Sequence, residues 1–317
     1  MESSRARRHR SARPPRRRPL LYAALAAVVV GGVTAGGTVY VKARARSGAA
    51  AVSSAAPPAA SSAGADEEAS VEPVTEPAAD RDALLRAAMA KVAVPSGATV
   101  SAAVLAVDSG ESAVYGDAAF DTASIVKVDI LAALLLRAQD AGRHLTAAER
   151  ASAAKMIENS DNASATELWH TIGRAAGLDA ANRRLGLQRT SGGEGELWGL
   201  TRTTAADQLV LLQQVFGADS ELSAASRTYL RGLMESVEPD QRWGVSAAAD
   251  GGSWALKNGW LPRSTTGRWV VNSIGLVTAD GTDCLVAVLS NGTTTQPKGI
   301  SLVEAAAKAA VSVFGDK

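Results

Sequence analysis

The 317-residue chain has few sulfur, histidine or aromatic side chains. Its one cysteine, Cys284, rules out a disulfide within the chain and lies in the apolar run TDCLVAVLS, which predicts a buried strand. The three histidines, His9, His144 and His170, show no spacing suited to a zinc site. We therefore expect neither a metal nor another cofactor.

The folded part of the chain also has no excess of charge of one sign. Residues 1–46 carry eleven Arg and Lys against one Glu, and residues 47–80 carry six acids and no base. The remaining residues, 81–317, carry 22 bases and 25 acids, a net charge of only −3. Because nucleic-acid binding depends on clustered Lys and Arg, we expect no nucleic acid as a partner of this region.

One long stretch has no charge at all. Residues 20–41 are uncharged and mostly apolar, and a helix of about 20 such residues crosses a bilayer. Eight arginines in residues 1–19 precede the stretch and three bases follow it, which predicts a cytoplasmic N-terminus and a single-pass anchor in the cell membrane. The tripeptide ARA at 43–45 resembles a cleavage site, so a cleaved signal and a secreted domain remain the alternative.

The segment that follows is predicted to be a linker. Residues 42–80 consist largely of Ala, Ser, Pro and, toward the end, acidic residues. With few large apolar side chains, the segment cannot offset the entropy of ordering, so we expect a disordered spacer. The folded domain should then occupy residues 81–317, outside the cytoplasm.

Apolar patterning within this domain predicts strands at both ends and helices in the middle. ATVSAAVLAVDSGESAVYG predicts two strands joined by a turn, and SWALKNGW, RWVVNSIGLVTA and TDCLVAVLSNG predict three more. A hairpin signal, ADGT, separates the last two. Helical patterns lie at about 124–141, 147–158, 163–175, 179–185, 203–216 and 223–235, and SLVEAAAKAAVSVFG predicts a last helix. This is an α+β arrangement: an antiparallel sheet flanked by helices, with a separate helical lobe.

Ser124 and Lys127 lie three residues apart at the start of a helical run. Positions i and i+3 share a helix face, and the positive end of the helix dipole disfavours a protonated lysine, so Lys127 is a candidate base for the Ser124 hydroxyl. The same spacing recurs at Ser152 and Lys155, but those residues lie inside a helix that begins at the capping box TAAE. Only Ser124 has an exposed setting that faces the helix dipole, and a surface serine beside a solvated lysine remains the alternative.

Two further short motifs follow. Ser160, Asp161 and Asn162 lie between predicted helices, where these residue types favour an N-cap but also provide a proton relay and a substrate-binding amide. The sequence SATE, Ser164 to Glu167, predicts a second capping box just after them. Lys257 and Gly259 lie on a predicted strand, and glycine in a strand marks a close approach of another group.

In this order, S-x-x-K, S-D-N and K-x-G resemble the motifs of the penicillin-recognising serine enzymes, the class A β-lactamases and D-Ala-D-Ala peptidases, over roughly residues 81–317. The resemblance implies that Ser124 is the nucleophile of an acyl-enzyme, Lys127 its base and Ser160 the relay of a proton to the leaving nitrogen. It further implies that Asn162 binds the acyl amide, and Lys257 the substrate carboxylate. The N–H groups of Ser124 and of Trp260, next to Gly259, would form the oxyanion hole.

The sequence departs from the family pattern at two places. The middle residue of the third motif is Asn258 in place of Thr or Ser. Class A enzymes carry a deacylating Glu in the pattern E-x-x-L-N; GGEGELWGL offers Glu194, with Glu196 in reserve, but Trp198 stands where the Asn would be.

The expected function is that of a membrane-anchored, monomeric serine hydrolase that opens β-lactams through an acyl-enzyme on Ser124. Two alternatives remain. One is a penicillin-binding D-Ala-D-Ala peptidase acting on peptidoglycan stem peptides, and the other is a wall-binding or sensing module with little catalysis.

Overall fold

A computed structural model describes residues 80–315 of the chain. The predicted cytoplasmic segment 1–19, the predicted membrane anchor 20–41 and, apart from its last residue, the predicted linker 42–80 lie outside the described residues. Among residues 80–315, no helix has the length and apolarity that crossing a bilayer requires.

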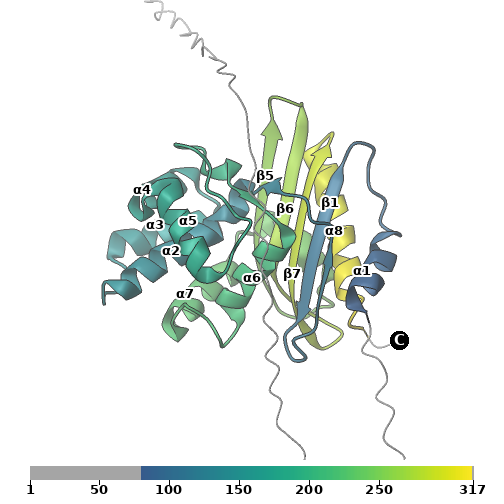
Figure 1. Cartoon of the computed structure of the whole chain (residues 1–317), viewed down its shortest axis with the longest axis horizontal. Helices are drawn as coiled ribbons and strands as arrows, with labels where there is room; N and C mark the ends of the chain where they lie inside the picture. Colours follow the sequence, from purple (N-terminus) through teal and green to yellow (C-terminus); the bar gives the residue numbers. More distant parts are fainter. Residues whose placement is uncertain (1–79, 316–317) are drawn as a thin grey trace, which may run out of the picture. The chain divides into compact units, whose positions relative to one another are not determined.

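The core of the domain is a five-stranded antiparallel sheet in the order β2-β1-β7-β6-β5 (Figure 1). Val104 pairs with Val286, so the first long strand and the last one are neighbours in the sheet. The strands from the two ends of the domain therefore pair as the sequence predicts, and the α+β prediction is confirmed. The strands are β1 (Thr99–Ala106), β2 (Ser112–Tyr115), β5 (Trp254–Arg263), β6 (Arg268–Ala279) and β7 (Thr282–Thr293).

Alternation along each strand gives the sheet two apolar faces. Ala102 and Val104 of β1 face a core shared with α1 (Arg81–Met89) and α8 (Gln296–Val311). Ala103 and Leu105 face the opposite core, where α6 (Ala205–Phe216) lies against the sheet. The sheet is thus covered by helices on both sides (Figure 1).

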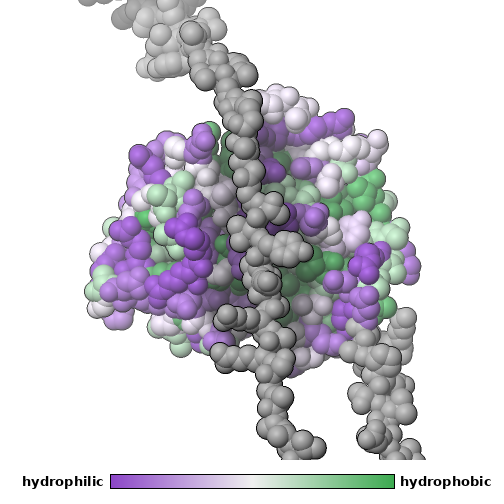
Figure 2. All heavy atoms as spheres, viewed as in Figure 1, coloured by the Kyte–Doolittle hydropathy of each residue, from purple (hydrophilic) through white to green (hydrophobic). Residues whose placement is uncertain are grey.

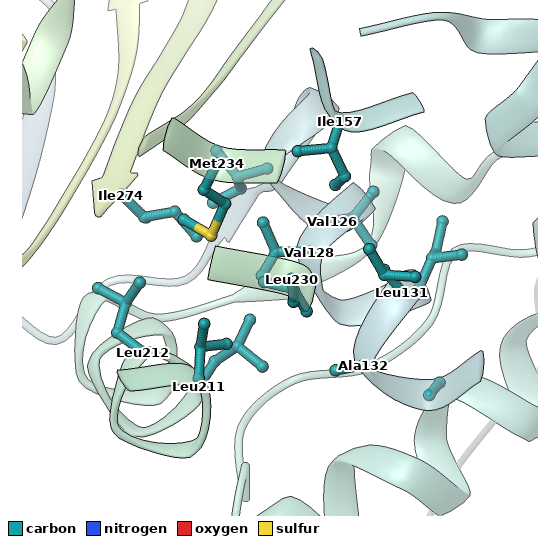
Figure 3. Packing of buried hydrophobic residues seen from close by; sticks show 14 of the residues in the cluster. Val126, Val128, Leu131, Ala132, Ile157, Leu211, Leu212, Leu230, Met234 and Ile274 are labelled. Carbon is teal, nitrogen blue, oxygen red and sulfur yellow. The ribbon is translucent and has the colours of Figure 1, made fainter. Parts of the chain in front are cut away.

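The helical lobe surrounds one almost wholly buried helix, α2 (Val126–Asp140). Figure 3 shows Val128 and Leu131 of α2 packed among side chains of the neighbouring helices, with Met234 beside Ile274 of β6. Since α2 begins next to the sheet and runs into the lobe, its first turn lies where the two parts meet. The other lobe helices are α3 (Ala147–Glu158), α4 (Asn162–Ile172), α5 (Arg174–Leu185) and α7 (Ala224–Glu235).

Hydrophilic residues gather on the outer surface of the helical lobe, at the left of the view in Figure 2. This distribution fits helices that turn one face to the core and the other to water.

Several element boundaries differ from the predicted ones for local reasons. The helix predicted over 163–175 ends at Ile172, because Gly173 adopts a left-handed conformation and α5 then starts at Arg174, earlier than predicted. The last helix begins five residues before the predicted start at Ser301, because the Thr295 hydroxyl caps it and Pro297 fits its first turn.

The two capping boxes proposed from the sequence fare differently. Thr146 and Glu149 form the predicted box at the start of α3. The box predicted at Ser164 and Glu167 is wrong, because Asp161 caps α4 by accepting a hydrogen bond from the Ser164 N–H at 2.7 Å.

Candidate active site

The nucleophile candidate Ser124 lies in a single 3-10 turn, Ala123–Ile125, that leads into α2. The short strand β3 (Phe120–Asp121) precedes this turn and pairs with β4 (Arg202–Thr203). Ala123, directly before the serine, has a φ of 48°. Left-handed conformations of this kind cost a non-glycine residue free energy and concentrate at functional sites.

The turn is fastened to the sheet by Asn272 of β6. Its side-chain amide donates hydrogen bonds to the Asp121 and Thr122 carbonyls, both at 2.9 Å, and its oxygen accepts from the Ser290 N–H at 3.0 Å. Sequence analysis missed this residue. The signal in the sequence was a polar residue inside the apolar run RWVVNSIGLV, and the structure buries this residue completely.

Gly259 of β5 allows the sheet edge to reach the same turn. A Cβ at this position would lie 2.7 Å from the Ser124 nitrogen and 2.8 Å from the Thr122 carbonyl oxygen. The close approach predicted for this glycine is therefore present. It brings β5, and with it Trp260, alongside the nucleophile turn, as an oxyanion hole built from the N–H groups of Ser124 and Trp260 requires.

Lys127 extends from the first turn of α2 toward the S-D-N segment. Its Nζ donates to the Ser160 carbonyl at 2.7 Å, the Ser160 Oγ at 3.0 Å and the Asn162 Oδ1 at 2.8 Å. Burial lowers the pKa of Lys127 to about 7, against the opposing effect of the nearby Asp161 carboxylate. A large neutral fraction near pH 7 suits Lys127 to accept a proton.

Ser160 stands between two lysines. Its Oγ lies 3.0 Å from the Lys127 Nζ and 3.1 Å from the Lys257 Nζ. Ser160 also has a left-handed φ of 55°, at the turn where α3 ends and α4 begins. A hydroxyl donates one proton and accepts through two lone pairs, so Ser160 can pass a proton between groups on either side.

The S-D-N segment combines the cap and the site that the sequence left as alternatives. The Asp161 side chain caps α4, and hydrogen bonds from the Ser164 hydroxyl and the Ser164 N–H hold the pKa of Asp161 below its ordinary value. This cap fixes the turn from which Ser160 and Asn162 reach Lys127.

Lys257 of β5 is completely buried, and its Nζ also donates to the Asn258 carbonyl at 3.0 Å. Desolvation, with a smaller contribution from Lys127, places the pKa of Lys257 well below its ordinary value.

Asn258 turns away from this site. Its Nδ2 donates to the carbonyls of Gln241 at 2.7 Å and Trp243 at 2.9 Å. The side chain that replaces Thr or Ser in the third motif therefore ties β5 to the segment before it, and its amide protons are already used.

The two candidate deacylating residues do not contact Lys127. Glu194 is exposed, and its carbonyl accepts from the Leu197 N–H. The Glu196 carboxylate pairs with His170 at 2.6 Å and Arg174 at 3.0 Å, which lowers the pKa of Glu196. Within residues 80–315, Lys127 forms no ion pair with a carboxylate; the ring of Trp198 lies over its Nζ instead, 5.0 Å from centroid to nitrogen.

A cleft of about 590 Å³ opens beside the β5 edge of the sheet, and Lys127 and Lys257 are buried outside its lining. Ser124, Asn162 and Trp260 line it, as predicted, together with Trp198 and Arg263. Arg263 is held by Asp121, with Nη1 3.2 Å from Oδ2. In the described part of the chain, no three His, Cys, Asp or Glu side chains gather in a way that would hold a metal ion.

The second serine–lysine pair lies elsewhere. Ser152 is inside α3, and its hydroxyl donates to the Glu167 carboxylate at 2.8 Å. Lys155 is exposed. The structure thus brings together the predicted set and leaves out the chance repeat.

A serine at a helix start, two buried lysines and a bridging serine hydroxyl form the arrangement of a serine hydrolase of the penicillin-recognising type. Residues 146–314, just over half of the chain, match the Beta-lactamase enzyme family, and the chain belongs to this family. The predicted enzyme class, a serine hydrolase of the β-lactamase type, is confirmed by this membership.

Solved structures show the same fold. A beta lactamase from Xanthomonas campestris is 22% identical, with a TM-score of 0.63 over 74% of this chain and 99% of its own. A structure titled PBP-A is 21% identical, with a TM-score of 0.63 over 73% and 96% of the two chains. A mutant of PBP-A, described as an acyl-enzyme complex with penicillin G, is 23% identical, with a TM-score of 0.62 over 73% of this chain and 96% of its own. A search of curated protein sequences finds no relative of this chain.

Proposed function

We propose that this protein opens β-lactams by forming an acyl-enzyme on Ser124. The observation that carries the proposal is the continuous hydrogen-bonded path from Lys127 through the Ser160 hydroxyl to Lys257. Lys127 lies one helical turn after Ser124, which lines the cleft. In the described part of the chain the Ser124 hydroxyl makes no hydrogen bond, so its proton is free to be taken when substrate aligns the groups.

In the proposed reaction, the Ser124 Oγ attacks the lactam carbonyl and its proton passes to neutral Lys127. The new oxygen–carbon bond gives an oxyanion that the N–H groups of Ser124 and Trp260 stabilise. The carbon–nitrogen bond then breaks, and the nitrogen takes its proton from the Ser160 hydroxyl, which is resupplied from Lys127.

The buried lysine and the cleft arginine define how substrate is held. Arg263 lines the cleft and provides positive charge toward a carboxylate, and Asn162 offers its amide to the acyl side chain. Lys257 lies outside the cleft lining and is hydrogen-bonded to the Ser160 hydroxyl, through which it acts on the substrate. A penicillin and a D-Ala-D-Ala stem peptide both present an amide and a carboxylate of this kind.

A second candidate, the D-Ala-D-Ala peptidase, is favoured by the position of the acidic residues. Glu194 lies outside the cleft lining. Glu196 lines the cleft, but its carboxylate pairs with His170 and Arg174, and the Lys127 Nζ hydrogen-bonds only to Ser160 and Asn162 within residues 80–315. An enzyme without a carboxylate at this point acylates readily and deacylates slowly toward water.

Turnover of a chromogenic cephalosporin distinguishes the two candidates. Many equivalents hydrolysed per chain support a β-lactamase, whereas a burst of one equivalent followed by a slow phase supports a penicillin-binding peptidase. No burst and no turnover would reject both and favour a sensing or wall-binding module.

For its location, we propose a domain held outside the cytoplasm by the apolar segment 20–41. The charge bias around that segment supports this topology, and a peptidoglycan substrate would lie on the same side of the membrane.

A further inference from the structure

The Trp198 ring contacts Lys127 in addition to the S-D-N segment. The three hydrogen bonds of the Lys127 Nζ all go to Ser160 and Asn162. The same nitrogen lies over the indole ring of Trp198, 5.0 Å from the ring centroid. The indole Nε1–H donates to the Thr166 Oγ1 at 3.1 Å. Thr166 lies one turn after Asn162 on α4, and it lines the same cleft.

The loop that carries Trp198 is fastened at both ends. Thr201, three residues on, is fully buried, and its carbonyl accepts from the Thr122 N–H at 2.8 Å, beside the nucleophile turn. On the other side, the Gly193 N–H donates to the Thr201 hydroxyl at 3.1 Å. The ring is therefore held against Lys127 by contacts to α4 and to the turn of Ser124.

Indole has no group that can activate water. Its single N–H is a donor only, and here Thr166 already accepts from it. A water that attacks an ester on Ser124 needs a proton acceptor beside it, and an apolar ring excludes both the water and an approaching carboxylate.

We propose that Trp198 sets the lifetime of the acyl-enzyme by shielding the Ser124 ester and Lys127 from water. This inference rests on the proposed acylation of Ser124. It assigns to Trp198 a role in the fate of the acyl group: the ring leaves formation of the ester in place and slows its hydrolysis.

Adduct formation and loss, followed by mass spectrometry on the full chain after penicillin G is removed, tests the proposal. We expect Trp198→Ala to shorten the lifetime of the penicilloyl adduct by about tenfold or more, without faster formation, which is a barrier lowered by about 1.4 kcal/mol for each factor of ten. Trp198→Phe keeps a ring over Lys127 and should stay within about threefold of the unaltered chain.

The matched control is Trp254→Phe. Trp254 begins β5 and stacks on Arg242, 5.5 Å from ring to guanidinium carbon, outside the cleft lining. Neither step should change in this variant. A general loss of structure would slow formation and lower the melting temperature, whereas the proposed role changes adduct loss alone.

The outcomes separate this inference from the proposed function. An adduct that forms on Trp198→Ala and lasts as long as on the unaltered chain overturns the role of Trp198 only. If Trp198→Ala forms no adduct, the test is made on Thr166→Val, which removes the acceptor of the indole N–H. A shorter lifetime of the penicilloyl adduct on Thr166→Val supports the proposal, and an unchanged lifetime overturns it. Absence of any adduct on the unaltered chain rejects the proposed function, and the inference with it.

Discussion

At the residue scale, the site depends on placing two amines where water does not reach them. Lys127 and Lys257 are both buried, and both share the Ser160 hydroxyl. Two ammonium groups at this separation repel each other, and desolvation adds to the cost, so the pair is held with at least one neutral amine. That neutral amine is the property that a base in acyl transfer needs.

Acylation of Ser124 should therefore rise with pH through about 7. Burial lowers the pKa of Lys127 to about 7, and only the neutral amine above that pH accepts a proton. We expect the second-order rate of penicillin acylation to fall about tenfold per pH unit below this value and to level off above it. Measurement from pH 5 to 9 checks this, with Lys127→Arg as an inactive control because its guanidinium stays protonated.

Because of Asp129, two residues after Lys127, we expect the free energy of unfolding to depend on pH. Burial raises the pKa of this carboxyl from 3.8 to about 7, against the opposing effects of a 3.4 Å hydrogen bond from Gln208 and a backbone hydrogen bond. Between pH 4 and pH 7 the folded chain keeps a proton that the unfolded chain loses, so stability falls as pH rises across this window.

Asp129→Asn should remove that slope and raise the free energy of unfolding at pH 8. The gain is bounded by about 1.4 kcal/mol for each unit between the two pKa values. Urea unfolding at pH 5 and pH 8 measures it, with the exposed Asp219→Asn as the matched control. Equal slopes in Asp129→Asn and the unaltered chain would show that Asp129 does not carry this dependence.

At the scale of elements, the site forms where the first turn of α2, the α3–α4 connection and strand β5 converge. The contact of β5 with the nucleophile turn depends on Gly259, since a Cβ would lie 2.7 Å from the Ser124 nitrogen and 2.8 Å from the Ile125 nitrogen. The distance between β5 and the nucleophile turn therefore decides whether the N–H groups of Ser124 and Trp260 can both reach one substrate oxygen.

Gly259→Ala should separate β5 from the nucleophile turn and cost about 10²–10³ in the acylation rate, the loss seen when one oxyanion donor is removed. Gly232→Ala in α7 is the control, because nothing lies within 4 Å of its added Cβ and alanine favours a helix. Stopped-flow acylation kinetics with melting temperatures test both. An acylation rate for Gly259→Ala equal to that of the unaltered chain would argue against the oxyanion assignment.

How much was predictable differs between elements. The period of the apolar residues predicted the sheet and the lobe, because strands and helices repeat at different spacings. The resemblance of the ordered motifs to the penicillin-recognising enzymes implied that Ser124, Lys127, Ser160 and Lys257 meet, although Ser124 and Ser160 lie in turns. The contact of the Trp198 ring with Lys127 was not predicted. It depends on the loop 193–201, whose hydrogen bonds to Thr166 and Thr122 join residues far apart in the sequence and leave no local sequence pattern. The wrong capping box at Ser164 has a similar origin: Asp161 competes for the same N–H.

At the scale of the whole molecule, the domain has two parts, the sheet and the helical lobe, and its cleft lies between them. The proposed anchor and spacer precede a domain whose first helix, α1, packs against α8 on the side of the sheet opposite α6. The cleft is lined by the Ala123–Ile125 turn, by α4 and by β5, and α1 and α8 do not contribute to it.

The full chain should sediment with membranes and resist extraction by high salt, because an apolar span is held by burial of its side chains and not by charge. Deletion of residues 1–41 should move the domain to the soluble fraction. If expression of the full chain instead gives a soluble protein whose first residue lies just after residue 45, the segment is a cleaved signal.

The central claim, a nucleophilic Ser124, is tested most directly by mass spectrometry of the chain after brief incubation with penicillin G, followed by peptide mapping. The account predicts one penicilloyl group per chain, on the peptide that contains Ser124, and none on Ser124→Ala, while Ser152→Ala is labelled like the unaltered chain. Labelling that persists in Ser124→Ala, or no labelling of the unaltered chain, would contradict it.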